Sequence, residues 1–168
     1  EVRSDLEFRD LRGNIETRLN KLKTEGWDGI IMAAAALHRL NMSDQITRYL
    51  DPLQFVPAVG QGAIGLEIKQ GREKLEKLVE SIIDIETTQC CQAERLFLSR
   101  LEGGCSSAIG CWGRMENRRF LITGYASASN GSKVVRKSLK GMPADSSQLA
   151  LQLAEEFERA GAKELLAK

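Results

Sequence analysis

The sequence predicts an incomplete α/β layer followed by a small α+β domain with a three-stranded antiparallel sheet and helices. Residues 30–36 form a continuous apolar run, which is typical of a parallel strand covered on both faces. Residues 109–116, 119–126 and 132–139 instead have the pattern of three short strands. They are separated by Asn117-Arg118 and by Asn130-Gly131, and the second of these pairs strongly favours a hairpin turn.

The bulk composition narrows the possible class of protein. With 168 residues, of which 42% are hydrophobic and 28% charged, the chain is long enough and apolar enough to bury a core. No apolar run approaches the length of a membrane span. The 24 basic and 23 acidic residues give a formal net charge of +1, so we expect neither nucleic acid nor a membrane as a partner. Because the chain opens at Glu1 in what reads as the middle of an element, we expect a fragment or a processed product.

The sequence of the first third of the chain predicts short helices and one strand. Asn14 is suited to cap a helix in which Ile15, Leu19 and Leu22 form the apolar stripe. The strand at 30–36 follows, and short helices are predicted over 37–40 and 43–50. This order is typical of an α/β layer.

Two arginines flank the first predicted helix start. Arg12 precedes the cap and Arg18 lies about one turn inside the helix. A helix N-terminus favours anions through its free N–H groups and its dipole, and guanidinium groups bind carboxylates and phosphates through a planar fork. The pattern therefore predicts a carboxylate or phosphate site, and the alternative is a solvated helix with surface arginines.

Gly60, Gly62 and Gly65 have the G-x-G-x-x-G spacing of the dinucleotide-binding motif, but their position relative to the predicted strands is wrong for that motif. The glycines precede the predicted strand at 64–68, whereas the fingerprint must follow a strand. The segment also lacks the Gly-Lys-Ser/Thr of a phosphate-binding loop. We interpret it as a hinge or a tight crossing.

The second half of the chain predicts three further helices around the meander. One opens at residues 71–73, a second covers about 88–101, and a third is predicted to start at a capping box over 145–148 and to end at Gly161. Leu149, Leu153 and Phe157 should form the inward face of the last helix.

The helix predicted at 88–101 leads into Gly103, Gly104 and Cys105. Two glycines permit positive φ and leave no side chain to shield the thiol. The cysteine is therefore either a small half-buried residue or a thiol held out for covalent attachment.

The remaining cysteines and the one histidine do not have the spacing of metal ligands. Cys90, Cys91 and Cys111, taken with Cys105, fit neither a disulfide framework nor metal-binding pairs, which indicates reduced thiols in a cytosol-like compartment. His38 has no neighbours of ligand type, so we expect a surface residue and no metal site.

Several blocks, taken together and in order, resemble the C-terminal part of the porphobilinogen deaminase (hydroxymethylbilane synthase) family over essentially the whole chain. Departures from the family pattern occur at Ala36, His38 and Ala108. The blocks are LRGN (residues 11–14), TRL (17–19), IIMAAA (30–35), LHRL (37–40), PAVGQGA (57–63), AER (93–95) and LEGGC (101–105).

The resemblance implies a domain organisation and an activity. Residues 1–57 would be the latter part of a second α/β domain, a periplasmic-binding-protein-like half. Residues 58–84 would be a crossover segment normally packed in the first domain, and residues 85–168 the C-terminal α+β domain that carries the cofactor cysteine. The family enzyme is a cytoplasmic transferase of tetrapyrrole (haem) biosynthesis that condenses four porphobilinogen molecules into hydroxymethylbilane and releases ammonia.

The cofactor assignment also follows from the resemblance. The family grows its product on a dipyrromethane cofactor linked to a cysteine by a thioether, and the matching residue is Cys105. Gly103 and Gly104 would leave room for the pyrrole.

The resemblance further assigns the substrate carboxylates to Arg12, Arg18 and Arg39, and places Gln61 near the cavity at the crossover. The family's catalytic aspartate belongs to an N-terminal domain, so we expect no catalytic residue in this chain and no activity from it alone. The chain should need an N-terminal portion or should self-associate. The alternatives are a non-catalytic carboxylate- or phosphate-binding module and a thiol redox or metal-handling protein.

Overall fold

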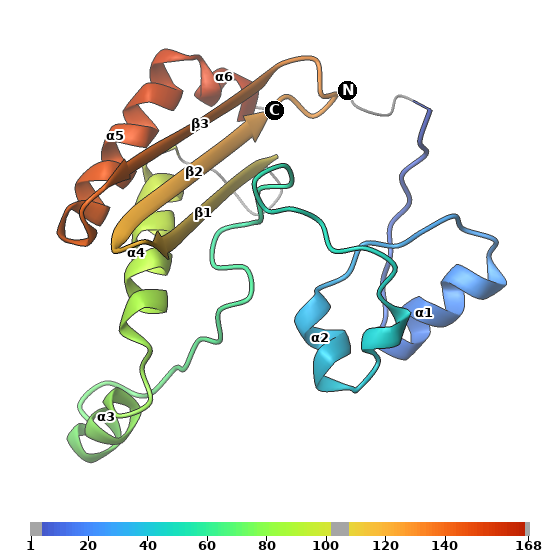
Figure 1. Ribbon diagram of the computed structural model, residues 1–168, viewed down its shortest axis with the longest axis horizontal. Coiled ribbons are helices and arrows are strands. Elements are labelled where there is room, and N and C mark those ends of the chain that lie inside the picture. Colours follow the sequence, from blue (N-terminus) through green and yellow to red (C-terminus); the bar gives the residue numbers. More distant parts are fainter. Residues whose placement is uncertain (1–4, 102–107, 167–168) are drawn as a thin grey trace. The chain divides into compact units, whose positions relative to one another are not determined.

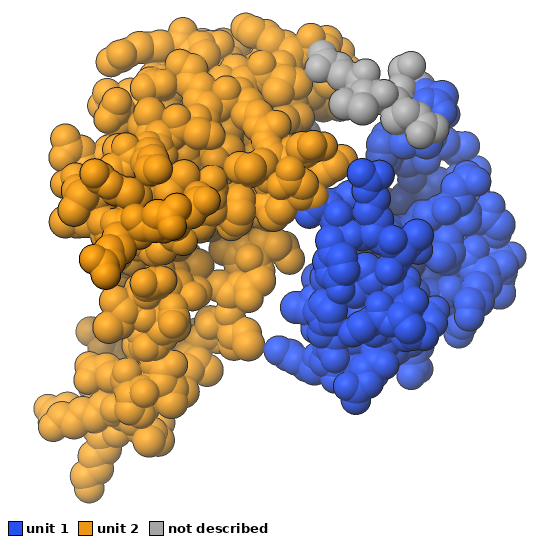
Figure 2. All heavy atoms as spheres, viewed as in Figure 1, with its two compact units in different colours: residues 1–50 blue, residues 51–168 orange. Residues whose placement is uncertain are grey.

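The structure, a computed structural model, describes residues 5–101 and 108–166. The chain divides into two compact units, residues 1–50 and residues 51–168 (Figure 2). No helix within the described ranges is long and apolar enough to cross a membrane.

Unit 1 is helical wherever the structure describes regular elements in it. It contains α1 (Ile15–Thr24), α2 (Ala34–Arg39) and the short 3-10 helix η1 (Ser43–Gln45) (Figure 1). Among the described residues of unit 1, Leu37 on α2 is the buried apolar one, with 6% of its surface exposed.

The strand predicted at 30–36 is absent from the described part of unit 1. Residues 30–33 form no strand and have no ladder partners, Ile31 is 73% exposed, and α2 begins at Ala34. An apolar run becomes a buried strand only when neighbouring strands pair with it, and the described residues of unit 1 contain none. The predicted helix over 43–50 is likewise reduced to η1. The periplasmic-binding-protein-like architecture of this part stays a prediction.

Unit 2 contains the predicted α+β domain. Its elements are α3 (Glu73–Glu80), α4 (Ile85–Arg100), β1 (Ile109–Glu116), β2 (Arg119–Ser127), β3 (Val134–Gly141), the 3-10 helix η2 (Pro143–Asp145), α5 (Ser146–Arg159) and α6 (Ala162–Leu166) (Figure 1). The three strands form an antiparallel sheet in the order β1-β2-β3. The predicted meander is therefore confirmed. The strand predicted at 64–68 is not, because those residues form no strand and pair with none in the part of the chain that the structure describes.

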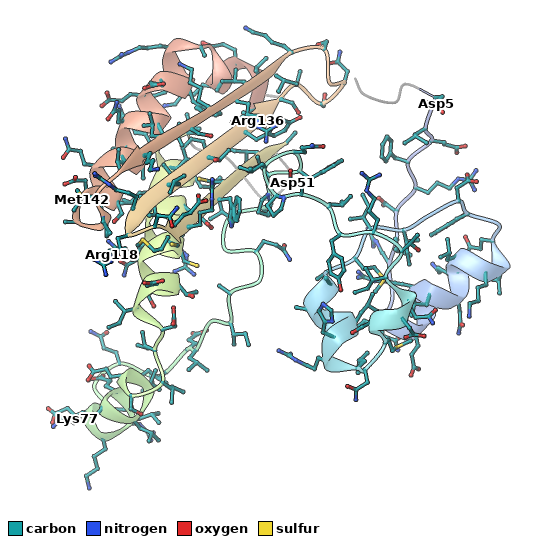
Figure 3. All side chains as sticks on the ribbon, viewed as in Figure 1. Asp5, Asp51, Lys77, Arg118, Arg136 and Met142 are labelled. Carbon is teal, nitrogen blue, oxygen red and sulfur yellow. The ribbon has the colours of Figure 1, made fainter. Side chains whose placement is uncertain are left out.

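The two hairpin connections follow the turn chemistry of the sequence. Asn117 and Arg118 (the latter labelled in Figure 3) both have positive φ, 50° and 59°, as a two-residue turn between right-twisted strands requires. The second connection is longer than a two-residue turn. The Ala128 N–H donates to the Lys133 carbonyl at 3.0 Å, and Gly131 takes a φ of 68° inside the loop.

The core of unit 2 lies between the sheet and the helices α4 and α5, which pack on one face of it. Phe97 of α4 and Phe157 of α5 meet edge to face with 5.0 Å between ring centroids, and both are fully buried. A Cβ atom on Gly124 of β2 would lie 2.8 Å from one ring and 2.9 Å from the other. Gly124 thus lets both rings approach the central strand.

The capping box predicted at residues 145–148 was wrong. α5 does begin at Ser146, but Asp145 makes no side-chain cap bond, because its backbone belongs to η2 and is not extended (φ −93°, ψ 7°). Ser146 is instead buried, and its hydroxyl accepts from the side chain of Gln89 on α4 at 2.9 Å. The Gln89 side chain also donates to the Pro143 carbonyl.

Candidate functional site

The first candidate site is the start of α1, where the LRGN block forms a cap. The side-chain oxygen of Asn14 accepts from the Thr17 backbone N–H at 2.8 Å and from the Thr17 hydroxyl at 2.7 Å. Gly13 precedes the cap with a φ of +121°, and a Cβ there would lie 2.8 Å from the Thr17 side chain. The block therefore fixes the direction in which the chain enters the helix.

The predicted arginines of unit 1 differ in how they are held. The Nε–H of Arg18 donates to the Gly13 carbonyl at 2.7 Å, which ties this side chain back over the cap and leaves the N–H donors of its two terminal nitrogens. Arg12 is 89% exposed and lies 4.0 Å from Asp10. Arg39 is the exposed last residue of α2. All three guanidinium groups belong to unit 1. Arg12 and Arg39 are exposed and Arg18 is partly buried, and guanidinium groups suit an anionic ligand.

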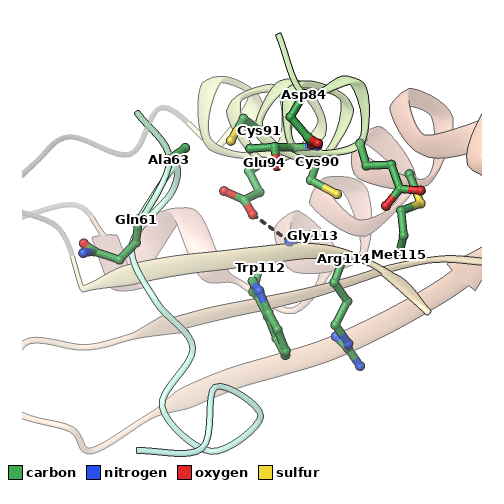
Figure 4. Close-up of a pocket in the computed structure, with 13 residues that line it drawn as sticks. Gln61, Ala63, Asp84, Cys90, Cys91, Glu94, Trp112, Gly113, Arg114 and Met115 are labelled. Carbon is green, nitrogen blue, oxygen red and sulfur yellow. Dashed lines mark hydrogen bonds between the residues drawn. The ribbon is translucent and has the colours of Figure 1, made fainter. Parts of the chain in front are cut away.

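The second candidate site is a solvent-open cavity of about 520 Å³ in unit 2 (Figure 4). One wall comes from α4, which contributes Cys90, Cys91 and Glu94, and another comes from β1. Gln61 lies at the cavity on a third segment, residues 56–63, which we call the crossover turn. Gln61 is one of the residues that line this cavity. Its predicted place at the cavity of the interdomain crossover stays a prediction.

The crossover turn covers the outer edge of β1. The Cys111 N–H donates to the Pro57 carbonyl at 3.0 Å. The next edge N–H, from Gly113, donates to an oxygen of Glu94 at 2.7 Å (Figure 4). Two of the donors that an edge strand exposes are thus satisfied inside the chain.

Glu94 holds the crossover turn as well as the strand. Its second carboxylate oxygen accepts from the Gly60 N–H at 2.7 Å, while only 5% of the residue is exposed. Burial raises the pKa of Glu94, and the amide bonds from Gly113 and Gly60 lower it by less. One buried carboxylate therefore bridges a helix, an edge strand and a turn.

Sequence reasoning missed Glu94, although a signal was present. Cys90 and Phe97 on α4 and Leu101 at its C-cap are buried at helical spacing, and Glu94 occupies the same stripe. A carboxylate in an apolar stripe requires donors at its end. That requirement could have identified it as a structural or functional anchor.

The thiols of Cys90, Cys91 and Cys111 have the properties of buried or partly buried packing residues and not of reactive nucleophiles. Burial raises the pKa of Cys90 to about 11, and it raises the pKa values of Cys91 and Cys111 as well. A raised pKa leaves little reactive thiolate at neutral pH. Within the described ranges no cluster of three or more His, Cys, Asp or Glu could hold a metal ion. Burial and the raised pKa values argue against a redox role for these three thiols.

On the far side of β1 from Glu94, Trp112 and Arg114 extend together (Figure 4). The Arg114 guanidinium carbon lies 4.3 Å from the centre of the Trp112 ring, and its Nε lies 3.7 Å from Glu116. One terminal nitrogen of Arg114 is buried with no hydrogen-bond partner among the described residues. The stacking holds the guanidinium against the sheet.

His38 matches its predicted surface role. Its ring is exposed, lies 2.7 Å from the Ser43 hydroxyl and 3.1 Å from the Tyr49 hydroxyl, and stacks on Tyr49 (centroids 5.9 Å apart). These contacts stay inside unit 1. The predicted cofactor residues Cys105, Gly103 and Gly104 lie outside the described residues.

Comparison with known proteins gives a consistent result over both units. The family described as "Porphobilinogen deaminase, dipyromethane cofactor binding domain" matches residues 1–77, and "Porphobilinogen deaminase, C-terminal domain" matches residues 88–159. The first match contains Arg12, Arg18, Arg39 and Gln61, and the second contains Glu94.

Individual relatives agree with the family matches. The chain is 41% identical over 165 residues to a porphobilinogen deaminase of Alkaliphilus metalliredigens, which covers 98% of this chain and 52% of the relative. It is 38% identical to one of Syntrophobacter fumaroxidans (98% and 53%) and 36% identical to one of Geotalea uraniireducens (99% and 52%). The chain thus spans about half the length of these relatives. Two domain matches in the family's order, together with relatives that align over nearly the whole chain, show that this chain belongs to the porphobilinogen deaminase family.

Proposed function

We propose that this chain is the C-terminal part of a hydroxymethylbilane synthase, the cytoplasmic transferase that condenses four porphobilinogen molecules into hydroxymethylbilane and releases ammonia. The observation that carries the proposal is the match of the cofactor-binding and C-terminal domain families, in order, over residues 1–77 and 88–159. The relatives named porphobilinogen deaminase support it.

The donor set of unit 1 fits the chemistry of a dipyrromethane and of porphobilinogen, both of which carry acetate and propionate groups. Arg12, Arg18 and Arg39 offer guanidinium groups, which bind carboxylates through paired N–H donors. The tie from Arg18 to the Gly13 carbonyl restricts where that guanidinium can reach. We propose that these three side chains hold the carboxylates of the cofactor and of the growing chain.

We assign cofactor attachment to Cys105, flanked by Gly103 and Gly104, and substrate contact to Gln61. The dipyrromethane supplies the pyrrole to which the first porphobilinogen unit is joined. Gln61, at the mouth of the cavity, can donate from its amide nitrogen and accept at its amide oxygen. We place the general acid–base aspartate outside this chain, so that the chain alone is inactive.

The cofactor assignment is tested by mass measurement of the intact enzyme. A thioether-linked dipyrromethane should add a fixed increment to the peptide that contains Cys105, and Cys105→Ser should remove both the increment and turnover. Cys91→Ser serves as the matched control, because Cys91 lines the cavity but belongs to α4. Covalent dipyrromethane on the Cys105→Ser enzyme would overturn the assignment.

The arginine assignment is tested by Arg→Lys variants of Arg12, Arg18 and Arg39 in the intact enzyme. Lysine keeps the charge but loses the fork, so each variant should impair cofactor assembly or chain elongation more than folding. Arg159→Lys is the control, because Arg159 is an exposed arginine of α5 paired with Glu155. Normal turnover by all three variants would place the carboxylate site elsewhere.

We also propose that residues 51–85 are covered by another polypeptide segment, from an N-terminal portion or from a second copy. Apolar side chains here are strongly exposed, with Ile64 at 77%, Leu78 at 64% and Ile82 at 68%, and such surface favours association. Light scattering of the isolated chain should detect self-association that Ile64→Ser/Leu78→Ser reduces and Leu151→Ser, on α5, does not. A strictly monomeric chain would refute self-association.

A further inference from the structure

Glu94 joins two parts of unit 2 that are distant in sequence. Its two oxygens accept at 2.7 Å from Gly60 and from Gly113, which lie 34 and 19 residues away in the chain. Glu94 itself lies on α4, the helix that leads toward residue 105. A single side chain therefore fixes the crossover turn relative to the edge of the sheet and to this helix.

The crossover turn that Glu94 holds is folded by local backbone hydrogen bonds on either side of Gln61. Gly60 and Gly62 adopt φ values of 71° and 86° on either side of Gln61. The Gln61 N–H donates to the Ala58 carbonyl at 3.0 Å, and the Ala63 N–H donates to the Gly60 carbonyl at 3.1 Å. These successive turns fold locally, and the bond from Gly60 to Glu94 ties the folded loop to the helix.

We propose that Glu94 is a positioning residue, which anchors the Gly60–Gly62 turn against β1 and α4 and thereby sets the place of Gln61 at the cavity. The functional half of this inference rests on the proposed contact between Gln61 and substrate. The anchoring half rests on the two hydrogen bonds alone.

The choice of glutamate supports a positioning role. A buried carboxylate is costly in an apolar stripe, and an apolar residue would pack there at lower cost. Only a group with two acceptor oxygens on one planar end can accept from two separate backbone N–H groups in this way. Glutamine offers one acceptor oxygen, and aspartate is one methylene too short to reach the same two positions.

Amide hydrogen exchange on the full-length enzyme tests the anchoring half without any need for turnover. In Glu94→Gln, at least one of the Gly60 and Gly113 amides should exchange tenfold or more faster, while the amides of β2 keep their protection. Glu94→Asp should act in the same direction. Glu155→Gln, on the exposed face of α5, should leave both amides unchanged. Retained protection in β2 shows that the variant is folded.

A double-mutant cycle tests the functional half. Glu94→Gln should raise the KM for porphobilinogen severalfold in the wild-type background but not in a Gln61→Ala background, because Glu94 acts through Gln61. Unchanged exchange at both glycines would overturn the inference, and so would additive effects on KM. A wild-type enzyme that does not consume porphobilinogen would count against the proposed function alone, since the exchange measurement stands without it.

Discussion

Gly110→Ala should detach the crossover turn from β1. A Cβ at residue 110 would lie 2.7 Å from the carbonyl oxygens of both Val56 and Pro57. Carbon–oxygen contacts normally begin at about 3.3 Å, so the backbone of the turn would have to retreat by roughly 0.6 Å. Both oxygens are backbone atoms, and no side-chain rotation can relieve the contact.

The cost follows from the two ways in which the contact can be relieved. If the turn stays in place, the overpacked backbone costs about 1–3 kcal/mol. If the turn moves away, the bond from Cys111 to the Pro57 carbonyl is lost, at about 0.5–1.5 kcal/mol. Because the protein adopts the less costly of the two arrangements, we expect a loss of about 0.5–1.5 kcal/mol in the free energy of unfolding.

Urea unfolding of the chain measures this loss, and amide exchange at Cys111 shows which route is taken. Gly65→Ala is the matched control, because a Cβ there meets no atom within 4 Å and its φ is not positive. Faster exchange at Cys111 indicates that the turn has moved, and in the intact enzyme it should accompany weaker substrate binding through Gln61. A Gly110→Ala chain as stable as Gly65→Ala, with normal protection at Cys111, would refute the packing of the crossover turn against β1.

Three further predictions concern the core and the buried groups. Gly124→Ala should lower the free energy of unfolding by about 1–3 kcal/mol in urea titrations, because its Cβ would lie within 2.9 Å of two buried phenylalanine rings. The folded state raises the pKa of Glu94 above its ordinary 4.5, so the stability of the wild type relative to Glu94→Gln should be greatest below about pH 4.5 and fall as the pH rises through the raised pKa. Urea midpoints across this pH range measure the trend, and the opposite slope would contradict it. Iodoacetamide at pH 8 should modify Cys91 before Cys90 and Cys111, whose burial raises their pKa values more strongly. Mass spectrometry of the native protein gives the order, and early modification of Cys111 would contradict its place in the core.

The C-terminal domain could be predicted from sequence because its signals are local. Alternating apolar positions defined β1, β2 and β3 to within about two residues, and the turn at Asn117 and Arg118 has the positive φ values that a two-residue hairpin needs. The cap at Asn14 was found for the same reason, since the donor that it satisfies lies three residues away. Both the pattern and its partners fall within a short stretch of chain.

The apolar runs at 30–36 and 64–68 were mistaken for strands because strand pairing is not a local property. Their composition suits a buried strand, yet no strand among the described residues pairs with either. The N-terminal cap of the helix that starts at Ser146 was also mispredicted because it depends on a residue distant in sequence. The predicted capping box was locally plausible, but Gln89 of α4 binds the Ser146 hydroxyl instead. In both cases residues distant in sequence decide the outcome.

Glu94 shows that the sequence can indicate a hydrogen-bond partner even when that partner is distant in the chain. A carboxylate placed between Cys90 and Phe97 on a core-facing stripe must find donors or lose stability. Because the helix interior satisfies its own N–H groups, those donors must come from elements outside the helix. Gly60 and Gly113 supply them: one lies in a turn whose positive φ values require glycine, and the other lies on a strand where a Cβ would be 3.2 Å from the Cys90 carbonyl. The glycines, the glutamate and the edge strand are therefore one structural unit. The family resemblance at PAVGQGA and at AER marks two ends of the same hydrogen-bonded junction.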